Sequence, residues 1–416
     1  MNILYIDHYA GSPEMGMEFR PYYLSHEWVM MGHKVTIIAG DFSHLRQKNP
    51  IITEDFTTEI IDGIEYLWIR TGEYQGNGVK RAFSMLSFVG KLLSNAKTIA
   101  DKWKPGAVIA SSTYPLDTYA AQRIAKFAKA KYIHEVHDMW PSTLYEVGGM
   151  SKFHPFVVLM QFAENSAYEN CDKCVSLLPY AKEYMVQHGL QPDKFINIQN
   201  GIVEEEWVDF ESIPEEHVRF FEEHKDSFIV GYFGGHALSN ALDNVLDIAK
   251  ELLHCQKTER VIFVLVGEGV EKKRLIERAK QEHLKNVFFL RGISKKAIPD
   301  LIKHFDCSFM IGKSSPLYRF GLCLNKMFDS MMAGLPIICA FDAPETLVET
   351  FHCGYQCGSN DNRKIINAIK SLYNMSALER KQIGMNGKRA ILKYFTYSHL
   401  AEDFINVISN NEKEIK

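Results

Sequence analysis

Residues 228–250 read FIVGYFGGHALSNALDNVLDIAK: an apolar run, a loop with two glycines, and an amphipathic segment of helix length. Short apolar runs rich in β-branched and aromatic residues are typical of buried strands. Neighbouring parallel strands need a crossover between them, and this crossover is usually a helix. The stretch therefore predicts one strand of a parallel sheet and the helix that covers it.

The same alternation of strand and helix patterns runs through nearly the whole chain. Helix-length segments over 17–31, 80–102 and 117–130, for example, lie between strand patterns. This order predicts an α/β protein with two doubly wound, Rossmann-like parallel sheets in tandem. The predicted strands are NILYID (2–7), KVTIIAG (34–40), EYLWIR (65–70), AVIASS (107–112), KYIHEV (131–136) and KCVSLL (173–178) in the first half, then FIVGYF (228–233), ERVIFVLV (259–266), NVFFL (286–290), DCSFMI (306–311) and LPIICAF (335–341).

Residues 204–226, EEEWVDFESIPEEHVRFFEEHKD, interrupt the alternation, because they are acidic and have no strand pattern. We therefore predict a first domain over 1–205, an acidic linker over 206–226, a second domain over 227–395 and a C-terminal helix over 396–416. Doubly wound sheets bind ligands at the carboxyl ends of their strands. Two such sheets facing each other are expected to form a cleft that holds the chemistry.

The composition is that of an ordinary globular protein and excludes several functions. Hydrophobic residues make up 46% and charged residues 24% of the chain, and the net charge of -4 argues against a nucleic-acid partner. No run is long and apolar enough to span a membrane, and Asp7 argues against an N-terminal signal peptide. The eight cysteines, Cys171 and Cys174 among them, lack a second ligand pair for zinc, so we expect reduced thiols in a cytosolic protein.

Two polar sites follow strands of the first predicted sheet. The loop HYAGSPEMGMEFRPYY (8–23) contains Gly16 and opens a helix, but it lacks the GxGxxG pattern of dinucleotide-binding proteins. Its N–H groups suit an anion at the helix N-terminus, although a plain strand–helix connection explains the pattern equally.

The second site is HDMWP (137–141), where His137 and Asp138 are predicted at the cleft edge. A lone histidine is more often structural, but the position and the adjacent carboxylate favour function.

Three glycine-containing loops follow strands of the second predicted sheet. Glycine is common in such loops, so each one alone is a weak signal. Three of them at one edge of a sheet form a rim where the backbone can approach a ligand closely. The residues singled out in these loops are Gly234, Gly235, His236, Gly267, Arg291 and Gly292.

The stretch SPLYRFGLCLNKMFDSMMAGLPII (315–338) places two charges at the start of a predicted helix. Asn325 suits the N-cap, which puts Lys326 in the first turn and Asp329 three residues later on the same face. A cation in the first turn opposes the helix dipole, and this cost is explained if the lysine and the first-turn N–H groups bind an anion together. Asp329 can accept hydrogen bonds from two hydroxyl groups, as a sugar diol offers. The alternative is a solvated ion pair on an exposed face.

In their order along the chain, these motifs resemble family-four glycosyltransferases of the GT-B fold, and the resemblance covers nearly all of the sequence. HDMWP followed by NKMFD (325–329) is similar to the branch that builds bacterial O-antigen, capsule and exopolysaccharide repeat units. The other matching stretches are RPYYLSHEWVMMGHKVTIIAG (20–40), INIQNGI (196–202), VGEGVEKKRLIE (266–277) and GMNGKRAILKYFTYSHLAEDF (384–404). The resemblance implies an acceptor-binding first domain, a nucleotide-sugar-binding second domain, and C-terminal helices that pack back toward the first.

The resemblance also implies a transfer from a nucleotide sugar, expected to be a UDP-sugar, that retains the sugar's configuration and needs no metal or cofactor. His137, Asp138 and Lys326 are expected to be catalytic, with Lys326 stabilising the charge that develops on the leaving diphosphate. The residues expected to bind the donor are Gly16, Arg20, Gly234, Gly235, His236, Gly267, Arg291, Gly292, Arg319, Gly321, Asn325 and Asp329.

Two positions depart from the pattern of the family. Gly321 stands where relatives carry the first of two glutamates, which leaves a backbone N–H for the contact with the sugar, while Asp329 keeps the second carboxylate. Between Gly235 and Asn240 the basic pair that many relatives place on the diphosphate is absent. Lys326, with Arg319 or Lys313 nearby, is therefore the expected source of positive charge.

The acceptor that the resemblance implies is a glycan or a polyprenyl-linked sugar at the inner face of the plasma membrane. Residues 80–104 carry basic residues interleaved with Phe83, Met85, Leu86 and Phe88, as in an interfacial helix. A domain helix with a basic outer face explains this pattern equally. The expected location is the cytoplasm, with peripheral contact with the membrane.

Two other functions share these features. A sugar-nucleotide epimerase of the GT-B type would use the same two sheets, but it needs carboxylates that abstract a proton from the sugar ring. A catalytically silent partner subunit would keep the fold without turnover. Hydrolysis is disfavoured, because no pair of carboxylates has the context of a glycosidase acid and nucleophile.

Overall fold

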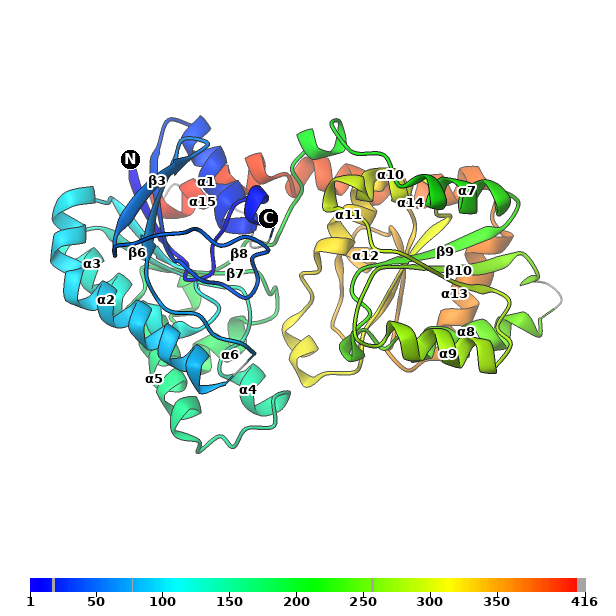
Figure 1. Cartoon of the computed structure of the whole chain (residues 1–416), viewed down its shortest axis with the longest axis horizontal. Coiled ribbons are helices and arrows are strands. Elements are labelled where there is room, and N and C mark those ends of the chain that lie inside the picture. Colours follow the sequence, from blue (N-terminus) through cyan, green and yellow to red (C-terminus); the bar gives the residue numbers. More distant parts are fainter. Residues whose placement is uncertain (17–18, 77, 256–257, 410–416) are drawn as a thin grey trace. The chain divides into compact units, whose positions relative to one another are not determined.

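The computed structural model divides the chain into two compact units (Figure 1). Unit 1 comprises Met1–Gln199 and Tyr397–Lys416, and unit 2 comprises Asn200–Thr396. The structure describes residues 1–16, 19–76, 78–255 and 258–409. Each unit contains one sheet of mainly parallel strands covered by helices, so the predicted pair of doubly wound sheets is confirmed.

The sheet of unit 1 has eight strands in the order β3-β4-β2-β1-β5-β6-β7-β8. Neighbouring strands are parallel except β3 and β4, which pair antiparallel. The direction of strand order reverses at β1 and β5, and ligands of such sheets bind at that point. The strands are β1 (Asn2–Ile6), β2 (Lys34–Gly40), β3 (Thr57–Ile61), β4 (Ile64–Ile69), β5 (Ala107–Ala110), β6 (Lys131–Val136), β7 (Lys173–Ser176) and β8 (Phe195–Asn197).

The C-terminal helix belongs to unit 1, where it packs on the first helix, as expected for the helices that return (Figure 1). Trp28 Nε1 donates to the carbonyl oxygen of Ala401 at 3.1 Å, and the rings of Trp28 and Phe404 meet edge to face at 5.3 Å. The helices of unit 1 are α1 (Phe19–Met30), α2 (Val79–Trp103), α3 (Thr118–Ala128), α4 (Ser142–Glu146), α5 (Pro155–Asn170), α6 (Lys182–Gln187) and α15 (Tyr397–Ser409).

The sheet of unit 2 is parallel throughout, with the strand order β11-β10-β9-β12-β13-β14. Its strand order reverses between β9 and β12, so a ligand is expected beside the carboxyl ends of these two strands. The strands are β9 (Phe228–Phe233), β10 (Val261–Val266), β11 (Val287–Leu290), β12 (Cys307–Ile311), β13 (Ile337–Ala340) and β14 (Gly354–Cys357).

Helices cover both faces of this second sheet (Figure 1). α8 (Leu242–Leu253), α9 (Lys272–Gln281) and α13 (Asn362–Asn374) share one apolar core with the sheet. The helices α7 (Glu215–Glu223), α10 (Ile298–Ile302), α11 (Asn325–Ala333), α12 (Leu347–Thr350) and α14 (Ala377–Tyr394) contribute to the remaining cores of the unit.

The segment expected as an acidic linker, 206–226, is packed as part of unit 2. Ile213 and the α7 residue Phe221 are each only 4% exposed and contact the core that contains Ile229. α7 is amphipathic, with acidic side chains outward and aromatic ones inward, so its acidic composition concealed a packed helix.

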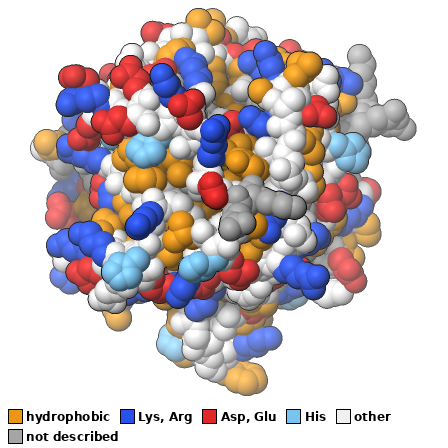
Figure 2. All heavy atoms as spheres, turned by 90° about the vertical axis from the view of Figure 1, so that its right-hand side faces the viewer, with side chains coloured by type: hydrophobic (Ala, Val, Ile, Leu, Met, Phe, Trp, Pro, Cys, Tyr) orange, Lys and Arg blue, Asp and Glu red, His pale blue; other side chains and the backbone are white. Residues whose placement is uncertain are grey.

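The surface of unit 2 mixes charges of both signs. Basic and acidic side chains are interspersed over the face that Figure 2 presents. Ion pairs such as Arg274–Asp243 and Arg278–Asp247 join α9 to α8. Among the helices in the described part of the chain, none has both the length and the hydropathy that a membrane crossing requires.

Candidate functional site

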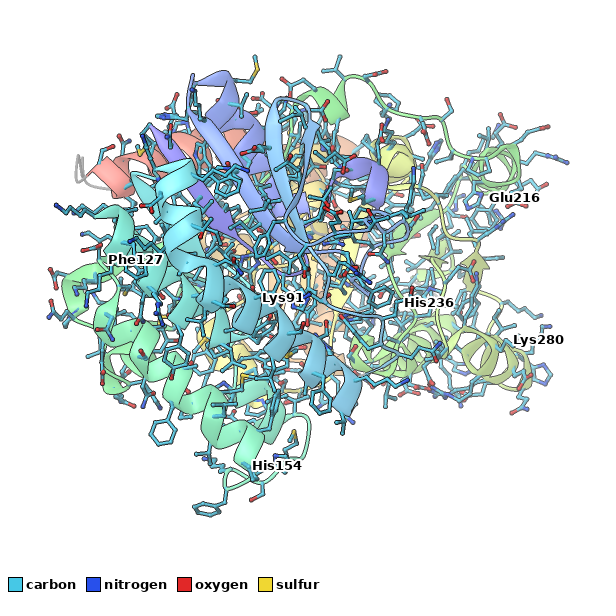
Figure 3. All side chains as sticks on the ribbon, turned by 60° about the vertical axis from the view of Figure 1, so that its left-hand side comes forward. Lys91, Phe127, His154, Glu216, His236 and Lys280 are labelled. Atoms are coloured by element: carbon cyan, nitrogen blue, oxygen red, sulfur yellow. The ribbon has the colours of Figure 1, made fainter. Side chains whose placement is uncertain are left out.

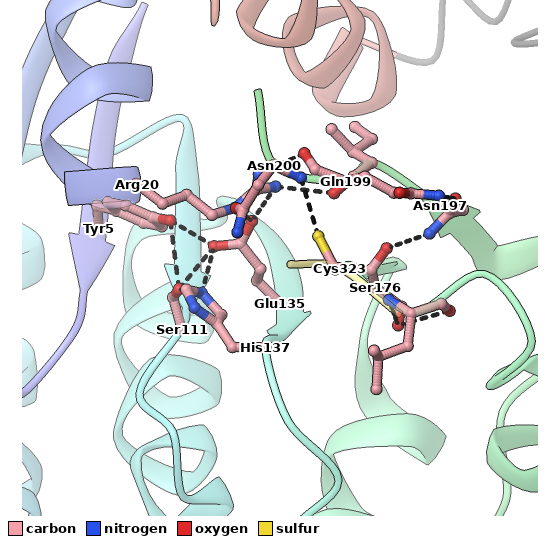
Figure 4. A network of polar contacts seen from close by, with 12 residues as sticks. Tyr5, Arg20, Ser111, Glu135, His137, Ser176, Asn197, Gln199, Asn200 and Cys323 are labelled. Carbon is pink, nitrogen blue, oxygen red and sulfur yellow. Dashed lines mark hydrogen bonds and ion pairs between the residues drawn. The ribbon is translucent and has the colours of Figure 1, made fainter. Parts of the chain in front are cut away.

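A buried network of polar side chains lies at the carboxyl ends of β1, β5 and β6 in unit 1 (Figure 4). Its centre is the ion pair between Arg20 of α1 and Glu135 of β6, in which both side chains are buried. Arg20 Nε and Nη2 donate to Glu135 Oε1 at 3.1 and 2.9 Å. Burial alone would raise the pKa of Glu135, but the charge of Arg20 and the hydrogen bonds hold it well below its ordinary value.

The second carboxylate oxygen of Glu135 accepts hydrogen bonds from three further side chains. Tyr5 donates its hydroxyl, Ser111 Oγ lies at 2.6 Å, and His137 Nε2 lies at 3.2 Å. His137 Nε2 is also 2.7 Å from Ser111 Oγ, and the imidazole is 16% exposed. The sequence analysis selected His137 but missed Glu135. The available signal was a glutamate inside a strand that is otherwise mostly apolar, two residues before His137.

The two donor-binding residues predicted from the first glycine loop are engaged inside unit 1. The Arg20 guanidinium is committed to Glu135 and to the carbonyl oxygens of Ile198 (3.0 Å) and Gln199 (2.7 Å), so it is a buried structural cation and not an exposed phosphate ligand. The Gly16 N–H donates to two carbonyl oxygens of the preceding 3₁₀ turn, which uses the group expected to face an anion.

Asp138 shapes the turn that leads from β6 to α4. Its Oδ1 accepts from the Met139 N–H at 2.8 Å and from Thr143 Oγ1 at 3.2 Å, and burial raises its pKa. Asp138 and His137 also line a small cavity of about 10 Å³, together with Trp140. A volume of this size holds about one water molecule.

In unit 2, the loops that follow β9, β10 and β11 meet as the sequence predicts. Gly267 has φ 154°, and a Cβ added there would lie 1.9 Å from the Gly234 carbonyl oxygen, so only glycine allows this approach. The Gly292 N–H donates to Glu268 Oε1 at 3.1 Å. Lys272, which the sequence analysis missed, donates to the carbonyl oxygens of Gly267 (2.8 Å) and Leu290 (2.9 Å) and so ties β10 to β11.

Two residues of this rim, His236 and Arg291, have very different exposure. His236 is fully buried, and neither ring nitrogen has a hydrogen-bond partner among the described residues. Burial lowers its pKa to about 4, so the ring is neutral and buried, although the sequence analysis expected His236 to be one of the donor-binding residues. Arg291 is exposed and lines a pocket of about 250 Å³ together with Gly292 and Ile293.

The loop before α11 explains why glycine stands at position 321. Gly321 has φ 96° and follows the 3₁₀ turn Pro316–Phe320, and its N–H donates to the Tyr318 carbonyl oxygen at 2.9 Å. The expectation that this N–H is available for the sugar is therefore wrong. The neighbouring Arg319 is exposed and donates to the Pro316 carbonyl oxygen at 2.6 Å.

α11 begins one residue earlier than predicted. Leu324 occupies the N-cap position and Asn325 is the first helical residue, where its Oδ1 accepts from Asn200 Nδ2 at 2.9 Å. The prediction of Asn325 as the N-cap is wrong, since the preceding residue already has extended backbone angles.

The two charges of α11 have different surroundings. Lys326 Nζ lies 4.7 Å from the centroid of the Tyr232 ring, and burial lowers its pKa to about 8. Burial raises the pKa of Asp329 to about 7; the charge of Lys295 opposes this shift, and that of Glu206 adds to it. Lys326 thus lies beside β9, near the reversal of the sheet, whereas the two charges that act on Asp329, those of Lys295 and Glu206, pair with each other at 3.0 Å.

Two family models match the chain, one in each half. "Glycosyltransferase Family 4" matches residues 15–206, and "Glycosyl transferases group 1" matches residues 214–390. A curated relative, the putative colanic acid biosynthesis glycosyl transferase WcaI of Escherichia coli K12, is 24% identical over 218 residues. That match spans 51% of this chain and 52% of WcaI, about half of the relative's length.

Solved structures share the fold over the whole chain. HepE of Anabaena, solved in complex with UDP, has a TM-score of 0.67 at 14% identity, with 99% of this chain and 100% of that chain covered. Sucrose-phosphate synthase from Thermosynechococcus elongatus has a TM-score of 0.71 at 14% identity, with 99% and 98% covered. Since the two family models together match nearly all of the sequence from residue 15 to residue 390, this chain belongs to the group 1 glycosyltransferases of family 4, which have the GT-B fold.

Proposed function

We propose that this chain transfers a sugar from a UDP-sugar to a glycan or polyprenyl-linked acceptor during synthesis of a bacterial surface polysaccharide. The family membership, the name of WcaI and the UDP bound to HepE support this proposal. The observation that carries it is the position of Lys326. The Lys326 side chain is half-buried beside β9, and its ammonium has no ion-pair partner among the described residues, which suits an anionic ligand such as a diphosphate.

In the proposed reaction, Lys326 and the first-turn N–H groups of α11 bind the diphosphate, and Asp329 binds ribose hydroxyls. The bond between the anomeric carbon and the diphosphate oxygen breaks as the acceptor hydroxyl attacks from the same face, which retains the configuration. The hydroxyl proton passes to the departing diphosphate. The charge that develops there is stabilised by Lys326, the role that a divalent cation has in other transferases. His137 and Asp138 of unit 1 are proposed to contact the transferred sugar or the acceptor.

A donor screen by thermal shift tests the donor site. A UDP-sugar that binds only the native state raises the melting temperature, and GDP- and dTDP-sugars serve as comparisons. Lys326→Gln and Asp329→Asn should each abolish most of this shift, whereas Lys313→Gln, an exposed neighbour, should weaken it less. A shift that survives both of the first two changes would place the donor elsewhere.

Turnover tests distinguish the proposed transferase from the alternatives. Activity with an added acceptor should persist in EDTA, since no metal is part of the proposal. Conversion of a UDP-sugar into its epimer without any acceptor would contradict transfer and support the epimerase. Donor binding without turnover toward any glycan or lipid-linked acceptor would support the silent subunit.

We also propose that unit 1 contacts the inner face of the membrane through the outer surface of α2, α3 and α5. Phe83 and Leu86 of α2 are 67% and 46% exposed, whereas Met85 and Phe88 are buried in the core and cannot take part. Lys91 is paired with Asp55 at 2.8 Å. Figure 3 shows α2, α3 and α5 side by side, with Lys91, Phe127 and His154 labelled on or next to them.

Exposed aromatic residues on the neighbouring helices extend this surface. Phe127 of α3 is 44% exposed, and Phe153 and Phe162, before and within α5, are 89% and 64% exposed. Apolar side chains among lysines are typical of interfacial contact with anionic lipid. The double variant Phe83→Ser and Phe153→Ser should co-sediment less with vesicles that contain phosphatidylglycerol. The control variant Leu378→Ser, which changes a similarly exposed residue of unit 2, should co-sediment as the unaltered protein does. No binding of the unaltered protein to such vesicles would contradict the membrane contact.

A further inference from the structure

We infer that Glu135 and Arg20 are positioning residues that hold the imidazole of His137 in one orientation and one tautomer for sugar transfer. The inference rests on the role proposed above for His137. It starts from the geometry of Nε2, which approaches Ser111 Oγ at 2.7 Å and Glu135 Oε2 at 3.2 Å. Both contacts involve the same ring nitrogen, so together they restrain the plane and the tilt of the ring.

The direction of these hydrogen bonds follows from the number of protons available. An ionised carboxylate only accepts, so the Ser111 hydroxyl, at 2.6 Å from Glu135 Oε2, gives its single proton to the glutamate. The serine oxygen is then left as an acceptor toward His137. Both neighbours of Nε2 are therefore acceptors, and the proton of a neutral His137 must reside on Nε2. Glu135 thereby selects the tautomer.

Arg20 is what keeps Glu135 ionised in a buried position. A buried carboxylate without a cation would take up a proton, since burial penalises its charged form. Glu135 would then become a donor itself and would compete with the Nε2–H of His137. Arg20 prevents this by donating two hydrogen bonds to Oε1.

The same guanidinium fixes the backbone at the end of the first segment of unit 1. It donates to the carbonyl oxygens of Ile198 and Gln199, and the chain enters unit 2 at Asn200. One buried cation thus sets the position of the His137 partner and of the point where the chain leaves unit 1. Three elements meet at this one group: α1, β6 and residues 198–199.

A double-mutant cycle separates positioning from general stability. Glu135→Gln should lower kcat by about 10- to 100-fold, as the loss of an orienting partner does, with little change in the KM for the donor. In a His137→Gln background, the same change should cost less than about 2-fold, because a positioning residue has nothing left to position. Equal losses of kcat in both backgrounds would overturn the inference.

Further variants keep the test informative if Glu135→Gln folds poorly. Ser111→Ala leaves the ion pair intact and removes one Nε2 contact, so it should lower kcat in the native background and not in the His137→Gln background. Tyr132→Phe is the control, because Tyr132 also lies on β6 and its hydroxyl shares a buried hydrogen bond with Thr118 of α3. This variant should lower the melting temperature without changing kcat. If Ser111→Ala also lowers the melting temperature without changing kcat, Glu135 and Ser111 have a structural role only.

The outcomes also separate this inference from the proposed function. If His137→Gln leaves kcat unchanged, the role proposed for His137 fails first, whatever Glu135 does. If His137→Gln lowers kcat but Glu135→Gln lowers it by the same further factor in that background, only the positioning role fails.

Discussion

The ammonium group of Lys326 rests on the aromatic ring of Tyr232, 4.7 Å from its centroid, instead of on a carboxylate. The cation–π contact stabilises the charge in part, but burial still lowers the pKa of Lys326 to about 8. A lysine with this pKa changes its charge within the range where enzymes are assayed. The charge proposed to bind the donor is therefore sensitive to pH.

Donor affinity should fall as the pH rises above about 8. A diphosphate binds the protonated lysine better, so the donor Kd should be lowest below pH 8 and rise several-fold, at most about tenfold per pH unit, above it. Calorimetric titration at pH 7.0, 8.0 and 9.0 measures this. Lys326→Arg keeps its charge throughout and should show a flat profile, which also controls for titration of the donor. Equal slopes in both proteins would contradict the role of Lys326.

Asp329→Asn should stabilise unit 2 at pH 8 while it weakens donor binding. The folded-state pKa of Asp329, about 7, lies above the ordinary value. The carboxyl therefore contributes stability at acid pH, and this contribution is lost as the pH rises through 7. A neutral amide should raise the free energy of unfolding by about 1–2 kcal/mol at pH 8 and by much less at pH 5. Urea unfolding at both pH values tests this, and a pH-independent difference would argue against it.

Gly321→Ala should destabilise the protein, whereas Gly90→Ala should not. Gly321 has φ 96°, where a Cβ costs about 1 kcal/mol or more. Gly90 lies within α2 with open space around it, so alanine there should add about 0.5–1 kcal/mol. Unfolding midpoints of both variants provide the measurement. Gly321→Glu, which restores the glutamate that relatives carry, should cause the same backbone strain. If this variant bound the donor more tightly and lost no stability, the interpretation of a strained turn at Gly321 would be contradicted.

Phe404→Ala should show that α15 is an integral part of unit 1. Phe404 is fully buried and packs on Trp28, so its truncation should cost about 3–5 kcal/mol. Leu378→Ala, at a residue 66% exposed in α14, should change the free energy of unfolding by less than about 0.5 kcal/mol. Urea unfolding followed by tryptophan fluorescence compares the two. Similar midpoints would mean that α15 contributes little.

The predicted strands all correspond to observed ones, but β3, β8 and β14 were missed. Each of these three is an edge strand: β3 and β8 lie at the two edges of the sheet of unit 1, and β14 lies at one edge of the sheet of unit 2. A central parallel strand is buried on both faces and is recognised as an apolar run, whereas an edge strand such as TTEII (57–61) is short and mixed in polarity. The helix α7 was missed for a related reason, since its acidic residues mask the apolar stripe that packs.

The sequence by itself determined the two parallel sheets, the glycine loops at their carboxyl ends and the charged start of α11. These features are local, because strand and helix periods and the backbone angles of glycine act over a few residues. Only the tertiary structure decided which polar groups meet: Arg20 pairs with Glu135, 115 residues away, His236 is buried, and Lys326 lies on Tyr232. The reason is physical. The state of a charged side chain depends on its burial and on its partner, and both arise from long-range packing that no local pattern contains.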